Sequence, residues 1–254
     1  MNTSTPNDDV IDLYEKLITL PYSALREIGE VQSSLSRIIQ ARPQDISAKV
    51  AFLKTLTMLG NAAEGIKLAE QIWRQGGKIA SYVEETYMEL LISLGMYDWC
   101  LNLALPKFEK DFDLEVIYPV IFNIAVGMGD LSLLERAAVK ANLGTETETI
   151  KLFIKHQREA KLETHFAKQQ QLINKILRGR QTGYEVLVET ERGWPELEIG
   201  VFAGGDSVDR YQLQVEIDKT VREYYESENI TPLDNVMTTV YDVKEHWAPI
   251  GPEA

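Results

Sequence analysis

The side chains best suited to nucleophilic, proton-transfer or metal-binding chemistry are few in this chain and lie far apart. There are three histidines, His156, His165 and His246, and one cysteine, Cys100. His156 and His165 are nine residues apart, about half a turn out of phase on a helix, so they cannot share one face as metal ligands. His246 follows a strand-like segment and is interpreted as a surface residue. We therefore predict no catalytic set, no metal site and no cofactor.

A glycine-rich stretch, Gly200–Asp206, follows a strand-like segment and is the nearest approach to a phosphate-binding loop. It lacks the paired lysine and the glycine spacing of nucleotide-binding loops, and the acidic residues around it would repel phosphate. The carboxylates of this region do not follow a calcium-loop spacing either; they are Asp206, Asp209, Glu216 and Asp218. We interpret the stretch as a turn and a helix cap, and the carboxylates as a solvated face.

Charge is distributed unevenly along the chain and constrains its partners. The net charge is −13 at neutral pH, with −8 in residues 1–150, +6 in 151–180 and −11 in 181–254. An acidic protein repels phosphate backbones, so nucleic acid is not an expected partner, although the basic segment 151–180 alone could bind it. Docking of this segment on the acidic C-terminal part, or on an acidic partner, is the more economical interpretation.

Composition also bears on the compartment. No apolar run reaches the ~18 residues of a membrane span, and the first residues lack the basic and apolar regions of a secretory signal. A single cysteine cannot form an internal disulfide and suits a reducing environment. These features predict a cytoplasmic protein without a membrane partner, in which Cys100 is a buried structural thiol.

A repeated pattern between residues 43 and 144 indicates the elements that would position a site in the first half of the chain. The dipeptides Leu59-Gly60, Leu94-Gly95 and Met128-Gly129 follow one another at intervals of 35 and 34 residues. Apolar residues precede each glycine by one, four, seven and eight positions, which is the stripe of an amphipathic helix. The pattern predicts three helix–turn–helix units, in which each glycine adopts a left-handed conformation that ends the first helix.

These units resemble the tetratricopeptide (TPR) repeat, which has a glycine between its two helices, a small residue five positions later and a proline near its end. The stretches that match are Gly60–Gly65, Gly95–Cys100 and Gly129–Leu134, with Pro43 where a preceding repeat would end. The chain departs from the family in lacking the tryptophan of the first helix, and Pro119 is expected to interrupt the first helix of the third unit. The resemblance covers about residues 9–144 and implies an α–α superhelix of hairpins; an irregular helical bundle is the alternative.

The TPR resemblance also implies a concave groove, built from the first helices of the units, that binds a protein or peptide partner. Carried over one position at a time, the groove residues are Lys54 and Thr57 from the first unit, Tyr82, Glu85 and Glu89 from the second, and Asn123 from the third. Glu85 and Glu89 would repel a carboxylate. The expected ligand is therefore a basic or apolar-anchored segment.

Local signals predict the remaining helices. Helices are expected over 9–20, 23–41 and, capped by Asp45, over 46–59, whereas residues 1–8 and 248–254 are expected to be disordered tails. Residues 145–179 are predicted as one connecting helix, capped by Thr145 and Glu148 and about 45–50 Å long, with a break in its polar middle as the alternative.

After residue 180 the pattern becomes strand-like. A hairpin is expected over 184–190 and 196–202, and a final strand over 236–243. Residues 208–227 fit either a strand followed by a helix or one helix. The predicted fold class is therefore α+β with two domains: the helical hairpins, and an acidic domain over 180–247 with a sheet of three or four strands.

The absence of a catalytic set and the presence of the repeat predict a non-enzymatic interaction protein, such as a TPR-like adaptor or chaperone. Two alternatives remain. The C-terminal α+β domain could be an enzyme or small-ligand module that the repeats deliver, or the acidic domain could bind a basic partner as immunity or mimic proteins do.

Overall fold

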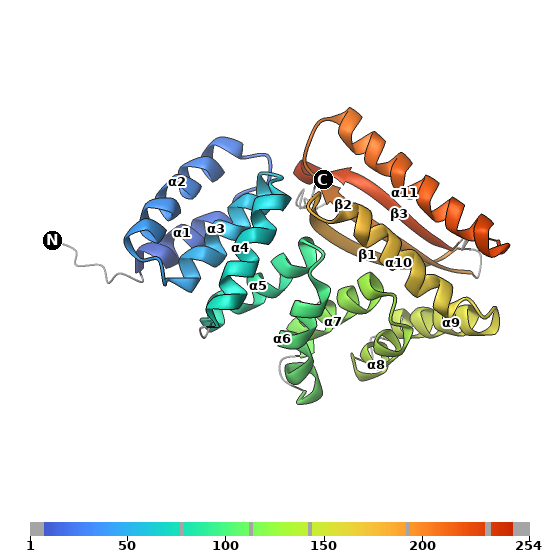
Figure 1. Cartoon of the computed structure of the whole chain (residues 1–254). Helices are drawn as coiled ribbons and strands as arrows, with labels where there is room; N and C mark the ends of the chain where they lie inside the picture. Colours follow the sequence, from blue (N-terminus) through green and yellow to red (C-terminus); the bar gives the residue numbers. More distant parts are fainter. Residues whose placement is uncertain are drawn as a thin grey trace, which may run out of the picture.

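The computed structural model describes residues 8–76, 79–111, 114–141, 144–191, 194–231 and 235–245 of the chain. This part contains eleven α-helices, three β-strands and one short 3-10 helix (Figure 1). The first eight helices are α1 (Asp8–Ile18), α2 (Leu25–Ala41), α3 (Ile46–Met58), α4 (Ala62–Gln75), α5 (Ser81–Ser93), α6 (Tyr97–Glu109), α7 (Leu114–Met128) and α8 (Leu131–Ala141). The C-terminal part comprises α9 (Thr145–Glu159), α10 (Glu163–Leu177), β1 (Gln181–Glu191), β2 (Trp194–Ala203), α11 (Ser207–Glu228), β3 (Val236–Asp242) and η1 (Val243–Glu245).

The first eight helices form hairpins whose odd-numbered members lie side by side. α3 contacts both α1 and α5, α5 contacts α7, and each even-numbered helix packs on a neighbouring odd-numbered one. Gly60, Gly95 and Gly129 have φ angles of 76°, 69° and 69°, which are the left-handed conformations that the repeated pattern predicts. The alanines nine residues beyond them are fully buried between the helices. The hairpins are therefore present, and the superhelical path of the TPR family stays a prediction.

Two local expectations in the helical hairpins have different outcomes. The Asp45 side chain accepts a hydrogen bond of 3.0 Å from the Ala48 backbone amide, which confirms the predicted cap of α3. The expectation that Pro119 interrupts the third unit is wrong, because α7 runs from Leu114 to Met128 with Pro119 inside it. Proline removes one hydrogen-bond donor near the helix start. The turns that follow are almost wholly buried, so packing maintains the helix.

The single connecting helix predicted over 145–179 is instead two helices. α9 ends at Glu159 and α10 begins at Glu163, and Lys161 between them has a φ of 58°. The break falls in the polar stretch that has no apolar face to bury, as the alternative interpretation held. It brings Phe153 and Phe166 into edge contact, with ring centroids 5.8 Å apart. The cap of α9 is Gly144, not Thr145 as predicted.

The C-terminal part forms a three-stranded sheet in the order β1-β2-β3. β1 and β2 pair antiparallel as the predicted hairpin, and β3, the predicted final strand, pairs parallel to β2 after the crossover helix α11. The stretch that fitted either strand or helix is one helix of 22 residues. Its core face is made of Leu213, Ile217 and Tyr225, which are buried.

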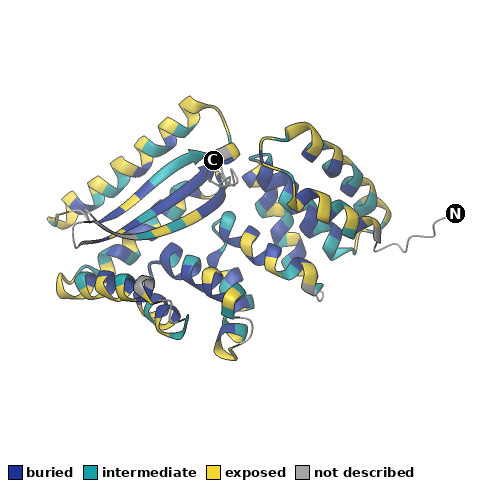
Figure 2. Cartoon of the chain, turned by 180° about the vertical axis from the view of Figure 1, so that it is seen from behind, coloured by how far each residue is buried: buried dark blue, intermediate teal, exposed yellow. Residues whose placement is uncertain are grey.

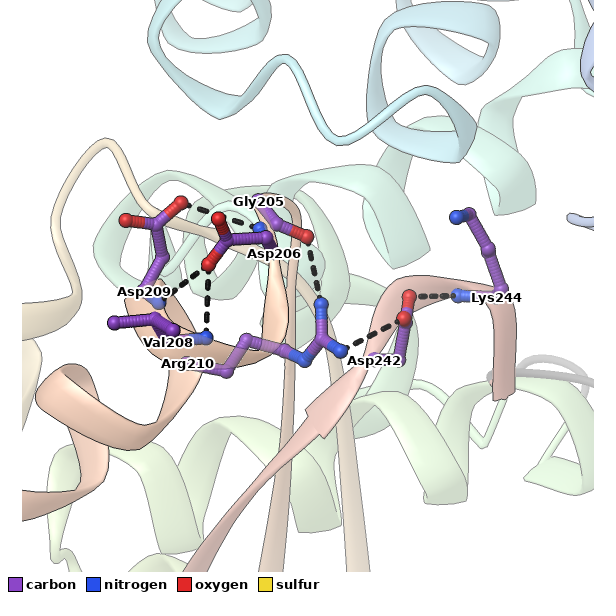
Figure 3. A network of polar contacts seen from close by, with 7 residues as sticks. All are labelled: Gly205, Asp206, Val208, Asp209, Arg210, Asp242 and Lys244. Atoms are coloured by element: carbon purple, nitrogen blue, oxygen red, sulfur yellow. Dashed lines mark hydrogen bonds and ion pairs between the residues drawn. The ribbon is translucent and has the colours of Figure 1, made fainter.

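Polar contacts fix the start of α11 to the end of β3 (Figure 3). Asp206 caps the helix by accepting hydrogen bonds from the Val208 and Asp209 amides, and the Asp209 side chain accepts one from the Asp206 amide. Arg210 donates to the Gly205 carbonyl at 2.7 Å and pairs with Asp242 at 3.0 Å. Residues 204–206 are therefore the expected turn and helix cap, whereas residues 200–203 belong to β2 and not to a turn. The carboxylates of Asp206 and Asp209 serve the cap.

The repeat glycines face the C-terminal part of the chain. A Cβ atom on Gly60 would lie 2.9 Å from the Cα of Gly204, and one on Gly129 would lie 2.5 Å from the Cα of Ala167. At the middle hairpin, the Gln181 side-chain amide donates a hydrogen bond of 3.2 Å to the Ile92 carbonyl at the end of α5, which also accepts one of 2.8 Å from the Gly95 amide. Each turn that ends a first helix is thus also a point of close approach between the two parts.

The layer of odd-numbered helices is consequently covered in part by the chain itself. β1 packs against α3, α5, α7 and α9, and α10 packs between α7 and α11. Figure 2 shows exposed residues on the outward faces of α2 and α11, and buried residues where the strands and inner helices meet. One cluster of buried side chains reaches from Tyr14 in α1 to Val243 in η1, so both parts share a core.

The basic segment 151–180 docks mainly through neutral side chains. Among the described residues, an ion pair between Arg180 and Glu216 at 2.5 Å links it to the acidic sheet region. Arg158 instead pairs with Glu135 of α8 at 2.9 Å. The α10–α11 contact includes a buried hydrogen bond of 2.8 Å from the Tyr225 hydroxyl to Gln169. Electrostatic docking on the acidic part is therefore a minor component of this contact.

Within the described residues, no helix has both the length and the apolar composition needed to cross a bilayer. The predicted tails fall almost entirely outside the described residues, apart from Asp8, which begins α1. His246, interpreted as a surface residue, also lies outside them.

Candidate functional site

A cavity of about 320 Å³ opens on the layer of odd-numbered helices, beside the area that β1 covers. Its walls come from α3, α5 and α7, from the turn between α1 and α2, and from β1. The residues that line it are Tyr22, Lys54, Glu85, Glu89, Leu90, Ile92, Ser93, Glu115, Val116, Pro119, Val120, Asn123 and Tyr184. Four of the six residues predicted for the groove are among them: Lys54, Glu85, Glu89 and Asn123.

The register of the repeat explains why these residues meet. Lys54, Glu89 and Asn123 each lie six positions before the glycine of their own unit. Equivalent positions on three helices that lie side by side point to the same side of the layer. Glu85 is one turn before Glu89 on α5 and extends the same row. Whether these residues bind a partner stays a prediction.

The other two residues predicted for the groove lie elsewhere. Thr57 is fully buried, and its hydroxyl donates a hydrogen bond of 2.8 Å to the Lys54 carbonyl. Its side chain therefore cannot contact a partner protein. Its position near the end of α3 is close to the point where Gly60 meets Gly204, and this end of the helix is covered. Tyr82 is 38% exposed and packs edge-on against Tyr14 with ring centroids 6.0 Å apart, outside the cavity lining.

Several lining residues were not found from the sequence. Tyr184 comes from β1, far along the chain, and its buried ring meets Tyr97 edge-on at 5.6 Å. Tyr22 lies in the turn after Pro21, where no helical periodicity signals its direction. Glu115 is in the first turn of α7 and could have been found by extending the repeat register. The strand contribution had no signal, because the repeat pattern says nothing about what covers the layer.

The cavity has an excess of negative charge. Glu85, Glu89 and Glu115 contribute three carboxylates and Lys54 one ammonium group. Burial raises the pKa of Glu89 above its ordinary value; the Lys54 ammonium opposes this shift and the Glu85 carboxylate adds to it. Burial likewise lowers the pKa of Lys54, and Glu89 offsets part of this change. Both groups are therefore shifted toward their neutral forms, a property that often marks functional sites.

Lys54 and Glu89 are close enough to influence each other without forming a contact ion pair. Among the described residues, no carboxylate oxygen lies within 4 Å of the Lys54 ammonium, and no hydrogen bond holds its side chain. Glu89 still contacts solvent through the cavity, although protein atoms surround it. The two groups thus face a shared space and are available to a ligand.

Replacing Glu89 with glutamine is expected to raise the melting temperature at pH 7. A carboxyl whose folded pKa is raised binds its proton more tightly when folded, so its contribution to stability is lost as pH rises through the folded pKa. We expect a gain of roughly 1–3 °C, small because Glu89 retains solvent contact, which disappears toward pH 4. Thermal unfolding followed by circular dichroism at both pH values measures it. Glu27→Gln on α2 is the control, and an equal gain from both variants would contradict the assignment.

The cysteine and histidine side chains of the described residues make contacts within the fold. The Cys100 thiol is fully buried and donates a hydrogen bond of 3.3 Å to the Met88 carbonyl. Burial also raises its pKa, as expected for a structural thiol. His165 lies on α10, and its Nδ1 is 2.7 Å from the Tyr224 hydroxyl of α11. The described residues contain no group of three or more histidine, cysteine, aspartate or glutamate side chains that could hold a metal ion.

The alternative of a ligand site in the C-terminal domain receives no support from its described residues. A shallow hollow of about 300 Å³ lies on the open face of the sheet over Gly200, beside Phe202 and Tyr241. Tyr241 donates a hydrogen bond of 2.8 Å to Glu198 there. Asp206, the polar residue on which that hypothesis depends, is not in its lining and serves the cap of α11.

The cavity between α3, α5, α7 and β1 is the candidate site, because it brings together four of the predicted groove residues, two of which, Lys54 and Glu89, have shifted pKa values. Comparison with protein-family models, with curated proteins and with solved structures finds no match to this chain.

Proposed function

We propose that the chain is an interaction protein that binds a basic segment of a partner protein, with a cationic side chain entering the cavity between α3, α5 and α7. The observation that carries the proposal is the convergence of Glu85, Glu89 and Glu115 on one cavity of the inner helical layer. A lysine or arginine side chain fits such a site because an apolar wall takes its aliphatic stem and the carboxylates bind its head.

The covered layer limits how much of a partner can be bound. Because β1 occupies part of the layer, we expect recognition of one or two side chains and not of a long peptide along all the units. Strand addition at the β3 edge is also disfavoured. The Gln214 side chain of α11 donates a hydrogen bond of 3.0 Å to the Thr238 carbonyl and accepts one of 2.8 Å from the Val240 amide. It therefore occupies the edge at which a partner strand would pair.

Replacing Glu85 with lysine is expected to weaken binding of a basic peptide about tenfold. The substitution turns an attractive charge at the cavity into a repulsive one, and Glu85 makes no hydrogen bond that the fold needs. The probe is a fluorescent peptide in which arginines alternate with leucines, and its affinity is measured by fluorescence anisotropy at low and high salt. The same peptide with glutamate in place of arginine tests the sign of the charge.

The matched control is Glu27→Lys, which makes the same charge change at an exposed position of α2. If both variants weakened binding equally, the net charge of −13 would be responsible and not the cavity. Equal affinity for the arginine and glutamate peptides would also contradict the proposal. Far-ultraviolet circular dichroism of each variant shows whether the fold is intact.

A further inference from the structure

Lys54 is the one lysine in the lining of the cavity, and its environment differs from that of a surface lysine. It lies midway along α3, is half-buried, and has neither a hydrogen bond nor a contact ion pair among the described residues. Tyr22, Glu89 and Asn123 share the space with it. A half-buried ammonium group without a contact partner is partly desolvated, so its amine is a candidate reactive group in this cavity.

We propose that Lys54 acts as a nucleophilic amine that forms an imine with a small aldehyde or ketone bound in this cavity. This goes beyond the binding of a basic segment and does not depend on it. The volume of about 320 Å³ is at the lower end of the range for small-molecule sites, which suits a compact carbonyl compound.

The lining indicates what kind of carbonyl compound would fit. Leu90, Val116 and Val120 offer apolar surface to a short carbon chain. The amide of Asn123 can donate a hydrogen bond to the carbonyl oxygen. The carboxylates repel anions, so the ligand is uncharged or cationic and not a keto acid.

The reaction requires a neutral amine and a proton donor, and the cavity offers both. Burial lowers the pKa of Lys54, so a larger fraction of its amine is neutral at pH 7 than in a solvated lysine. The nitrogen lone pair attacks the carbonyl carbon to form a carbinolamine. Burial raises the pKa of Glu89, which favours the protonated carboxyl that gives its proton to the departing hydroxyl group. Water leaves, and the carboxylate takes a proton from the iminium nitrogen, giving the neutral imine.

Reductive trapping tests the proposal on the full chain without any peptide. The protein is incubated at pH 7 with propanal and cyanoborohydride, which transfers hydride to the imine carbon and fixes the adduct. Peptide mass spectrometry then gives the rate of modification at each lysine. Lys54 is expected to be modified severalfold faster than the exposed Lys168 of α10, because burial leaves a larger fraction of the Lys54 amine neutral.

Further measurements separate a specific site from general reactivity. Raising the pH toward 10 should narrow the difference in rate, because solvated amines in general lose their protons there, and unfolding in urea should abolish it. Glyoxylate, an anionic aldehyde, should show less preference for Lys54 than propanal does.

Modification of Lys54 no faster than of Lys168 overturns the proposal. A failure here leaves peptide binding untouched, because that depends on Glu85 and is measured separately. If both hold, the basic peptide should protect Lys54 from propanal, since the two ligands occupy one cavity.

Discussion

Replacing Gly129 with alanine is expected to destabilise the folded chain by about 2–5 kcal/mol. Two independent effects add at this position. The backbone has a φ of 69°, which costs an alanine roughly 1–2 kcal/mol. The added Cβ would also lie 2.5 Å from the Cα of Ala167, so the helix α10 would have to move away from α7. Such overpacking costs typically about 1–3 kcal/mol.

Thermal and urea unfolding of the full chain measure this prediction. The matched control is Gly76→Ala at the end of α4, where φ is 62° and a Cβ would meet no atom within 4 Å. It should lose only the backbone contribution of about 1–2 kcal/mol. Gly204→Ala isolates the other effect, because its φ is not in the left-handed region and its Cβ would lie 2.9 Å from the Gly60 Cα. Equal losses for Gly129→Ala and Gly76→Ala would contradict the close approach of the two parts.

Gly60 and Gly129 each end a helix and also contact the C-terminal part of the chain. The repeat pattern could predict the first of these roles but not the second. Apolar residues at fixed offsets indicate where an amphipathic helix ends, and a glycine there indicates a left-handed turn. That prediction concerns only neighbours along the chain. The contact of Gly129 with Ala167 joins residues from different units and has no periodic signal. The repeat pattern therefore predicts the hairpins but carries no signal that the C-terminal part packs on their turns.

The residues of the candidate site likewise fall into those that the repeat register predicts and those that it does not. Lys54, Glu89 and Asn123 were found because a shared register on adjacent helices places side chains on one side of a layer. Thr57 was assigned to the same face but is buried, since the end of α3 is covered by the rest of the chain. Tyr184 was missed because it comes from a strand. Register predicted which residues point inward, and only tertiary packing decided which of them remain accessible.

Segments with conflicting local signals were the least predictable. Residues 208–217 alternate like a strand, with Tyr211 and Val215 among the apolar positions. In the structure both side chains are exposed on the outer face of α11, while Leu213 and Ile217 face the core. The capping contacts of Asp206 and the packing of the helix on β3 override the local alternation. An exposed apolar residue is common on protein surfaces, so alternation alone is weak evidence for a strand.

Replacing Asn235 with alanine is expected to cost about 2–4 kcal/mol, although Asn235 does not line the cavity. The Asn235 side chain accepts a hydrogen bond of 3.1 Å from the Gln157 side-chain amide of α9 and donates one of 3.1 Å to the Pro195 carbonyl of β2. Both partners are buried. Alanine would leave two buried polar groups unpaired, at roughly 1–3 kcal/mol each when no water reaches them. The Asn235 carbonyl would still accept from Leu197, so the strand start is retained.

A double-mutant cycle distinguishes this network from a general packing loss. Gln157→Leu removes the amide that Asn235→Ala leaves unpaired, so the double variant should be less destabilised than the sum of the two single variants, by about 1 kcal/mol or more. Asn61→Ala, at an exposed position without a side-chain hydrogen bond, should stay within about 0.5 kcal/mol of wild type. Strict additivity of Gln157→Leu and Asn235→Ala would contradict the network. Coupling between them would mean that the helical layer and the sheet are joined by buried polar contacts as well as by a shared core. The β1 wall of the cavity would then be held in place by the same cooperative unit that positions Lys54 and Glu89.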